Sequence, residues 1–286
     1  MRVSFPGERG AYSEAAAASF FAGRAIAVET VPHLTFAGAI GSTVDGDTDY
    51  TILPVENSIE GSVGESYDLL TSAPLVAAGE THHRIRHCLI GYGRISDVRQ
   101  AWSHPQALGQ CRRFLEGRKM RAVPAYDTAG SIKNVRDAKD REVAGIASRE
   151  AAELYGVPVI AEDIADNSSN YTRFLILAAR GRDTSGLAPP PGAGGTAAYK
   201  TSIILSLKHE PGSLYRVIRN FYENDVNMTK IESRPTRGNA WEYNFYVDFE
   251  GHAGDPRIAG MLERICSDSS VRVLGSYPSA APPPVG

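Results

Sequence analysis

The sequence predicts an α/β protein in two parts, in which a larger alternating part is followed by a small ferredoxin-like βαββαβ domain. In residues 1–180, strand-like and helix-like segments take turns, which is typical of α/β layers with largely parallel sheets. Residues 181–199 are rich in Pro, Gly and Ala without apolar periodicity, so we expect a linker there. Residues 200–278 then follow the ferredoxin-like order.

The first part shows recognisable helix starts after short apolar strands. Pro105 suits a first helical position, because its missing N–H has no partner there in any case. Ser148 is a typical N-cap. The predicted strands are 2–5, 50–55, 99–102, 143–146 and 174–177, and the predicted helices are 12–22, 63–72, one opening at 103–105, and 149–155.

The second part has clear periodicities. Apolar and polar residues alternate over 241–250, as in a half-buried strand. Leu214, Val217, Ile218 and Phe221 recur at helical spacing. The predicted strands are 201–208, 226–233, 241–250 and 271–275, the predicted helices are 213–224 and 257–267, and 279–286 is expected to be a disordered tail.

Composition excludes several classes of protein. The 286 residues carry 30 Lys+Arg against 33 Asp+Glu, a net charge of -3, which argues against a nucleic-acid binder. No apolar run is long enough for a membrane span, and the N-terminus lacks the apolar core of a secretory signal. Three distant cysteines fit reduced thiols in a cytoplasmic protein. No Cys/His spacing indicates a metal site.

Two features indicate a binding site for an anion. Four predicted helix starts carry small or hydroxylated residues, and exposed amides at such positions attract anions, although ordinary capping explains any one of them equally well. Polar residues also crowd before the strand at 174–177, where Arg173 can clamp a carboxylate and the Thr172 hydroxyl can donate or accept. A plain polar loop is the alternative for that segment. The four helix starts are 7–13, 57–62, 103–106 and 127–131.

These residues resemble a known family over positions 2–278. Tyr171-Thr172-Arg173-Phe174, with its preceding asparagines, resembles the TRF motif of prephenate dehydratases. Two later segments, 211–215 and 231–235, resemble the regulatory motifs of that family's ACT domain. The other matching segments follow in the family's order: 10–16, 54–58, 87–89, 103–108, 147–156 and 274–278.

The resemblance implies an activity and a fold. Such enzymes are lyases that convert prephenate to phenylpyruvate, CO2 and water on the route to phenylalanine, without a metal or organic cofactor. It implies that residues 1–180 form two α/β lobes around a cleft, like a type II periplasmic binding protein, and that 200–278 is an ACT domain through which L-phenylalanine exerts feedback.

The resemblance also implies roles for individual residues. Thr172 is the expected donor to the leaving hydroxyl, and Phe174 is an expected packed wall. Arg173 either holds the substrate's side-chain carboxylate or orients its loop. His104 either takes part in catalysis or only starts a helix. The remaining expected substrate contacts are Gly10, Ala11, Asn57, Ser58, Ser103 and Gln106.

For regulation, the resemblance implies an effector site at an ACT dimer interface in a homodimer or homotetramer. Amides after Pro211 are expected to hold the phenylalanine carboxylate. An ACT domain used only for dimerisation is the alternative. The expected effector residues are Gly212, Ser213, Leu214, Asn227, Glu232, Ser233 and Arg234.

Two other functions stay open. Gly10-Ala11-Tyr12 replaces the Gly-Thr-Phe of many family members, and together with 127–130 it looks more like plant-type arogenate dehydratases, which act on arogenate instead of prephenate. The second alternative is a solute-binding module without catalysis.

Overall fold

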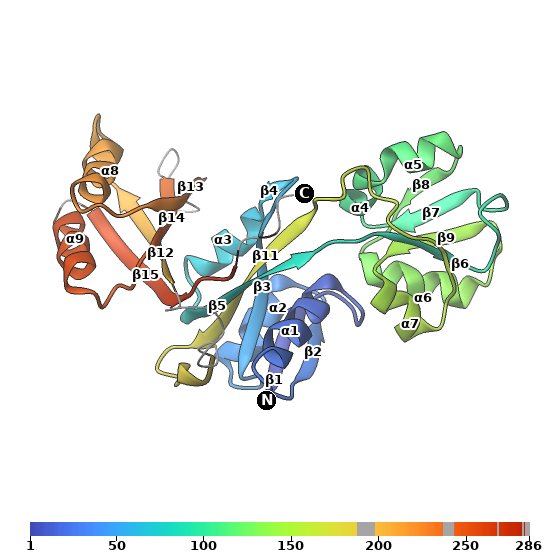
Figure 1. Cartoon of the computed structure of the whole chain (residues 1–286), viewed down its shortest axis with the longest axis horizontal. Coiled ribbons are helices and arrows are strands. Elements are labelled where there is room, and N and C mark those ends of the chain that lie inside the picture. The colour runs from blue at the N-terminus through green and yellow to red at the C-terminus, as the bar shows by residue number, and fades with distance from the viewer. Residues whose placement is uncertain (188–197, 237–242, 268, 282, 284–286) are drawn as a thin grey trace.

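The computed structural model describes residues 1–187, 198–236, 243–267, 269–281 and 283. Three sheets, each with its own helices, lie in a row in Figure 1. The middle body, which we call lobe 1, holds both the start of the chain and the strand that carries Thr172. Lobe 2 lies on one side of it, and the ferredoxin-like domain lies on the other.

Lobe 1 is a six-stranded sheet in the order β2-β1-β3-β11-β5, with β4 paired to β3. Strand β1 runs parallel to β2 and β3, whereas β11 is antiparallel to both β3 and β5. The lobe consists of β1 (Arg2–Pro6), α1 (Tyr12–Ala22), β2 (Glu29–His33), α2 (Phe36–Val44), β3 (Tyr50–Asn57), β4 (Gly61–Ser62), α3 (Gly64–Leu70), β5 (Leu75–Arg84) and β11 (Tyr171–Ala179).

Lobe 2 is a five-stranded sheet in the order β10-β6-β9-β7-β8. Strand β6 is antiparallel to its neighbours β10 and β9, whereas β7 is parallel to its neighbours β9 and β8. The lobe consists of β6 (Cys88–Gly91), β7 (Gln100–Ser103), α4 (Pro105–Gln110), α5 (Arg112–Gly117), β8 (Arg121–Pro124), α6 (Thr128–Ala138), β9 (Val143–Ala147), α7 (Arg149–Tyr155) and β10 (Val159–Ala161).

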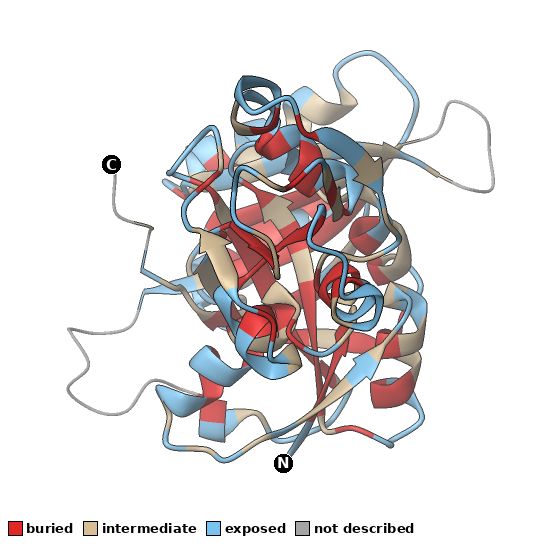
Figure 2. Cartoon of the chain, turned by 90° about the vertical axis from the view of Figure 1, so that its right-hand side faces the viewer, coloured by how far each residue is buried: buried red, intermediate tan, exposed pale blue. Residues whose placement is uncertain are grey.

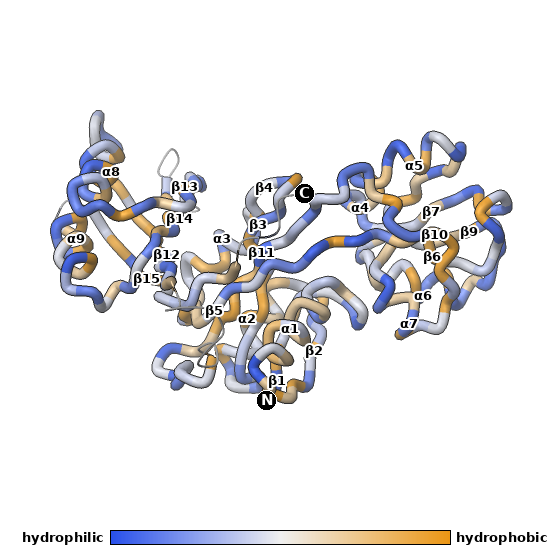
Figure 3. The backbone as a smooth tube through the Cα atoms, viewed as in Figure 1, coloured by the Kyte–Doolittle hydropathy of each residue, from blue (hydrophilic) through white to orange (hydrophobic). Residues whose placement is uncertain are grey.

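The chain crosses between the lobes twice, after β5 and again before β11. The two crossings are hydrogen-bonded to each other, from the Ile85 amide to the Asn170 carbonyl at 2.8 Å. The outgoing crossing is mostly hydrophilic (Figure 3). The sheet of lobe 1 is mixed because β11 returns from lobe 2 against the direction of β3, and the sheet of lobe 2 is mixed because β6 is antiparallel to its neighbours. The prediction of largely parallel sheets is therefore wrong.

The ferredoxin-like domain confirms the predicted βαββαβ order. Its antiparallel sheet has the order β13-β14-β12-β15, and both helices pack on one face around Phe221, Phe249 and Met261. The domain consists of β12 (Tyr199–Leu207), α8 (Ser213–Glu223), β13 (Met228–Pro235), β14 (Tyr243–Glu250), α9 (Pro256–Cys266) and β15 (Ser269–Pro278). Residues 241 and 242 of the predicted strand lie outside the described part of the chain.

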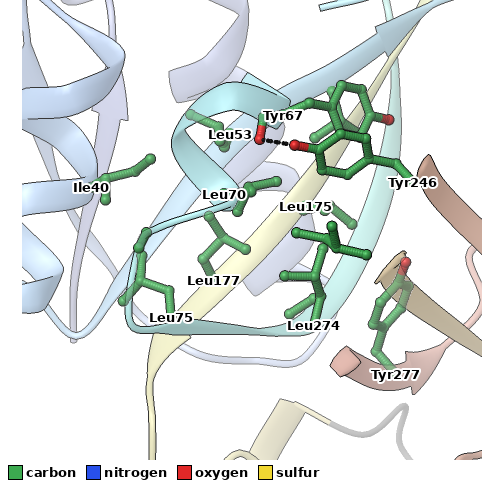
Figure 4. Packing of buried hydrophobic residues seen from close by; sticks show 14 residues of the cluster. Ile40, Leu53, Tyr67, Leu70, Leu75, Leu175, Leu177, Tyr246, Leu274 and Tyr277 are labelled. Carbon is green, nitrogen blue, oxygen red and sulfur yellow. Dashed lines mark hydrogen bonds between the residues drawn. The ribbon is translucent and has the colours of Figure 1, made fainter. Parts of the chain in front are cut away.

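The other face of this sheet packs against lobe 1. One hydrophobic cluster contains Leu70 and Leu175 of lobe 1 together with Tyr246, Leu274 and Tyr277 of the ferredoxin-like domain (Figure 4). The Tyr246 hydroxyl also donates to the backbone carbonyl of Tyr67 at 2.7 Å. The two bodies therefore share a core, in addition to the separate hydrophobic clusters of each. In Figure 2, the buried segments lie mostly inside the molecule and the exposed ones around its edge.

The predicted linker and the predicted tail each begin with residues that the structure holds in place by contacts. A short 3-10 turn, η1 (Ser185–Leu187), buries Leu187 in the core of lobe 1 beside α1. The tail prediction is wrong for its first two residues, because the Ser279 amide donates to the Ala198 carbonyl at 2.8 Å and the Ala280 amide donates to Glu80 at 3.0 Å. Residues 188–197, 282 and 284–286 lie outside the described ranges. In the part of the chain that the structure describes, no helix is long and apolar enough to span a membrane.

Candidate active site

A cavity of about 240 Å³ lies between the two lobes. Lobe 1 contributes residues from the carboxyl ends of β1 and β3 and from β11, and lobe 2 contributes the starts of α4 and α6. Carboxyl ends of strands are the usual place for ligands in open α/β sheets. Six predicted site residues meet there, namely Ala11, Asn57, His104, Gln106, Thr172 and Phe174.

Thr172 and Asn57 are cross-strand partners on β11 and β3. The Asn57 Nδ2 group donates to the Thr172 hydroxyl oxygen at 3.0 Å, while Asn57 Oδ1 accepts the amides of Ile59 and Glu60, each at 3.0 Å. Those two amides can only donate, so they fix which end of the Asn57 side chain faces Thr172. Thr172 is an acceptor toward Asn57, and within the described part of the chain its own proton has no acceptor. That proton can therefore be directed into the cavity.

Replacing Asn57 by aspartate tests this orientation. We expect Asn57→Asp to lower kcat about 10- to 100-fold, the loss found when a side chain that orients a reacting group is replaced. A carboxylate beside Thr172 accepts the hydroxyl proton and turns it away from the cavity. Asn167→Asp is the matched control, because the exposed Asn167 side chain only accepts, from the Ser169 amide. Equal kcat values for both variants and the wild type, measured by steady-state assay, contradict the assigned geometry.

A buried chain of hydrogen bonds continues from Asn57 along the cavity wall. Asn57 donates to Asn170 at 2.7 Å, and Asn170 donates to Gln110 Oε1 at 2.9 Å. His87 Nε2 lies 2.8 Å from the same Gln110 oxygen, and its Nδ1 lies 2.9 Å from the Tyr12 hydroxyl. Because Gln110 Oε1 can only accept, His87 Nε2 carries the proton. Sequence reasoning did not select Gln110, His87 or Tyr12 as site residues, although the segments 10–16 and 87–89 contain the last two.

Three histidines of β5 and the crossing that follows it, His82, His83 and His87, are partly or fully buried. Burial lowers the pKa of each below its ordinary value, so the folded protein holds them neutral near pH 7. Their stabilising contribution is complete above about pH 6.5, the pKa in the unfolded chain, and is lost as pH falls through the lower folded values.

The free energy of unfolding should therefore stay nearly level from pH 7.5 to about 6.5 and fall from about pH 6.5 to 5.5, a range above the ordinary titration of carboxyl groups. Each histidine contributes at most about 1.4 kcal/mol per pH unit. Urea unfolding across this range measures the effect. A free energy that stays constant or rises as pH falls contradicts neutral burial. The His87→Gln variant, which carries one such histidine fewer, should show a shallower fall than the wild type.

Four predicted site residues do not line the cavity. Gly10 has a φ of +85°, and a Cβ there would lie 2.9 Å from the Cα of Ala151 in α7, so this glycine permits close contact between the lobes. Ser103 is buried and donates to the Ile146 carbonyl at 2.7 Å, and Ser58 donates to the Ser169 carbonyl at 3.1 Å. Arg173 points to the opposite side of β11, away from the cavity.

The position of Arg173 corrects one of the two roles expected for it. Consecutive residues of a strand face opposite sides of the sheet, so Arg173 cannot share the cavity with Thr172. It is instead buried between lobe 1 and the ferredoxin-like domain, where it pairs with Glu80 and Asp248. No lysine or arginine within the described ranges lines the cavity. A bound anion therefore meets neutral donors and the amino ends of helices.

Asp127 is a cavity residue that sequence reasoning placed only within a helix start. It is the N-cap of α6, and its Oδ1 accepts the Gly130 amide at 2.6 Å. Burial raises the pKa of this carboxyl above its ordinary value, although the Gly130 hydrogen bond acts in the opposite direction. His104 caps α4 through an Nδ1 that accepts the Gln106 amide at 3.3 Å, so it both starts the helix and lines the cavity.

Comparison with known proteins decides the family. A prephenate dehydratase family profile matches residues 3–182. A curated Arabidopsis thaliana protein, arogenate dehydratase/prephenate dehydratase 2, chloroplastic, is 37% identical over 97% of this chain and 73% of its own length. The chain belongs to the prephenate dehydratase family. The matched residues include strand β11 with Thr172, and the profile covers both lobes.

Solved structures agree with the whole architecture. The prephenate dehydratase from Arthrobacter aurescens, in complex with L-Phe, is similar with a TM-score of 0.83 at 30% identity, and the match covers 98% of this chain and 90% of the other. A structure described as GqqA, a novel type of quorum quenching acylase, has a TM-score of 0.85 at 32% identity, with 99% of each chain covered. Both alignments include the ferredoxin-like domain, because they span nearly the entire chain.

The predicted effector residues of this prephenate dehydratase family member lie at three separate places within one chain. Ser213 and Leu214 line a cavity of about 150 Å³ with Tyr243 and Phe245, directly after Gly212. Asn227 lies in a different groove beside Tyr199 and Glu250.

The residues of β13 divide between two faces of its sheet. Glu232 accepts from Ser62 of lobe 1 at 2.9 Å, and Arg234 pairs with Asp68 of α3 at 3.2 Å. Ser233 faces the helix side of the sheet, because it pairs with Phe245. A single chain therefore does not gather the predicted effector residues into one pocket.

Proposed function

We propose that this chain is a prephenate dehydratase that converts prephenate to phenylpyruvate, CO2 and water. The observation that carries the proposal is the Thr172 hydroxyl at the cavity between the lobes, with its oxygen occupied by Asn57 and its proton available. Dehydration of prephenate needs a donor of this kind at the ring hydroxyl, whereas simple binding does not.

The reaction needs no base. The electron pair of the breaking bond to the ring carboxylate moves through the diene and expels the ring hydroxyl, and formation of an aromatic ring drives the step. The expelled oxygen takes up a proton and leaves as water. Threonine is a very weak acid, so Thr172 acts as a strong hydrogen-bond donor or as a relay to the leaving oxygen. Such help is typically worth about 10²–10⁴-fold in rate.

The cavity lining suits the loss of CO2. The neutral side chains of Gln106 and Gln110 can bind the carboxylates without a full positive charge. A cation that held the ring carboxylate in the ground state would oppose its departure. Apolar groups, including Phe36, Pro54 and Phe174, form the rest of the wall.

We assign catalysis to residues 1–180, as two lobes of the type II periplasmic-binding-protein kind, and regulation by L-phenylalanine to an ACT domain at 200–278. Two chain crossings between the lobes and the βαββαβ order support these assignments. The L-Phe complex of the Arthrobacter aurescens relative supports the effector. Assembly into a homodimer or homotetramer and a cytoplasmic location stay predictions, the latter supported by three unpaired cysteines.

An assay of the purified protein on prephenate and on arogenate, each with and without L-phenylalanine, tests the function. We expect phenylpyruvate from prephenate, and less of it when phenylalanine is added. Faster turnover of arogenate, with phenylalanine as the direct product, favours the plant-type activity. Calorimetric binding of prephenate without product indicates a non-catalytic binding protein and contradicts the proposal.

A further inference from the structure

Strand β11 has different functions on its two faces. Thr172 faces the cavity, and the next residue, Arg173, faces the ferredoxin-like domain with its side chain only 8% exposed. Arg173 donates through Nε to Glu80 at 2.7 Å, through one terminal nitrogen to Asp248 at 2.5 Å, and through the other to the Tyr277 hydroxyl at 3.1 Å. Two of these three hydrogen-bond partners belong to the ferredoxin-like domain, and a further ion pair joins Arg173 to Glu56 of β3 at 3.6 Å.

These partners are themselves held in place, and we call the set Glu80, Arg173, Lys200 and Asp248 the interdomain ion cluster. Lys200 of β12 donates to the fully buried Glu80 at 2.7 Å. The second oxygen of Asp248 accepts from Ser202 at 2.5 Å. Two cations and two anions thus balance within the cluster, and Glu56, which lies near Arg173, pairs with Lys230 at 3.1 Å. A buried pair of this kind adds little net stability, but its geometry is demanding.

The ladder between β11 and β3 is irregular at this point, whereas the ladder between β11 and β5 is regular from Tyr171 to Ile176. Arg173 pairs with Glu56 of β3, but the register shifts before Phe174, which pairs with Pro54. Proline has no N–H to give to the ladder. Because only one of the two ladders of β11 is regular here, the side-chain contacts of Arg173 add to what holds this part of β11 in position.

We propose that Asp248 is a positioning residue, through which the ferredoxin-like domain sets the position of the Thr172 hydroxyl by way of Arg173. This inference rests on the proposed function. Arg173 and Thr172 share a peptide bond, so a shift of Arg173 changes the distance between the Thr172 hydroxyl and Asn57. A change in how the ferredoxin-like domain docks can in this way reach the proton donor.

Two tyrosines of the interface distinguish the positioning of Arg173 from simple attachment of the domains. Tyr277 and Tyr246 both project from the same face of the ferredoxin-like sheet toward lobe 1. The Tyr277 hydroxyl contacts Arg173, whereas the Tyr246 hydroxyl contacts the carbonyl of Tyr67 in α3. Tyr277→Phe and Tyr246→Phe each remove one interface hydroxyl, but only the first removes a partner of Arg173.

The kinetic experiment compares Asp248→Asn, Tyr277→Phe and Tyr246→Phe with the wild type. Asp248→Asn keeps the shape of the side chain and an acceptor for Ser202. We expect kcat of Asp248→Asn to fall about 3- to 30-fold, while its KM stays within about 2-fold of the wild-type value. The kcat of Tyr277→Phe should also fall. Tyr246→Phe should keep the wild-type kcat, although its melting temperature falls about as much as that of Tyr277→Phe. Equal losses of kcat in Asp248→Asn and Tyr246→Phe overturn the inference.

Hydrogen exchange separates this inference from the proposed function. If the wild type does not convert prephenate, the proposed function fails, but exchange of the amides at 171–174 still tests the positioning role. We expect faster exchange there in Asp248→Asn than in Tyr246→Phe, without a difference in β1. Identical exchange in the two variants overturns the positioning role, whatever the substrate.

Discussion

Thr172→Val is expected to fold like the wild type and to lose about 10²–10³-fold in kcat, the usual result of removing one preorganised donor. Valine has nearly the shape of threonine and suits a strand. The substitution removes only the hydroxyl, on a residue that is 9% exposed. Asn57 keeps two other acceptors, Asn170 Oδ1 and the Tyr171 carbonyl, so no buried donor is left unpaired.

Thr172→Ser is the matched variant, since it keeps the hydroxyl and removes the methyl group. We expect most of the wild-type kcat to remain in it, whereas loss of the methyl lowers the free energy of unfolding by about 1 kcal/mol. Steady-state kinetics and urea unfolding of both variants give these numbers. If the valine variant turns over prephenate at nearly the wild-type rate, Thr172 is not the donor.

Gly275→Ala is expected to loosen the ferredoxin-like domain from lobe 1. A Cβ at Gly275 of β15 would lie 2.0 Å from the carbonyl oxygen of Ala77 and 3.0 Å from its nitrogen. Both atoms belong to the backbone of β5, so relief requires a shift of a whole sheet. We expect a loss of about 1–3 kcal/mol from the free energy of unfolding, the usual range for overpacking.

Gly260→Ala is the matched control within the same domain. Gly260 lies in α9, where the nearest atom to a new Cβ is an Arg264 terminal nitrogen at 3.7 Å. Alanine should stabilise this helix by about 0.5–1 kcal/mol. Urea unfolding gives the free energies of both variants. A Gly275→Ala protein as stable as the Gly260→Ala protein contradicts the close approach of β15 to β5.

Elements with strong local signals could be predicted from sequence. Helix α1 was predicted at its observed bounds, and Ser148 caps α7 as expected by accepting the Ala151 amide at 3.0 Å. The mixed direction of the lobe 1 sheet could not be predicted, because it depends on β11 returning from lobe 2 to pair with β3 and β5. Pairing between strands so distant in sequence leaves no local periodicity.

The site was predicted in part for similar reasons. Thr172, Asn57 and His104 were expected in one cleft because they lie in motifs, and the structure brings them together. Gln110 has no motif signal, since its role depends on the packing of α4 against both chain crossings. The direction of Arg173 was not predicted, because the strand was expected to begin at 174. Since β11 begins at Tyr171, Thr172 and Arg173 are consecutive strand residues and face opposite sides of the sheet.

A crystal structure with a ring-reduced, unreactive analogue of prephenate is the most direct measurement of how Thr172 works. The analogue's ring hydroxyl oxygen should lie about 2.7–3.0 Å from the Thr172 hydroxyl oxygen, at hydrogen-bonding distance, while Asn57 still donates to Thr172. An analogue bound in the cavity with its ring hydroxyl against another wall, and with Thr172 touching none of its oxygens, contradicts the proposed donor.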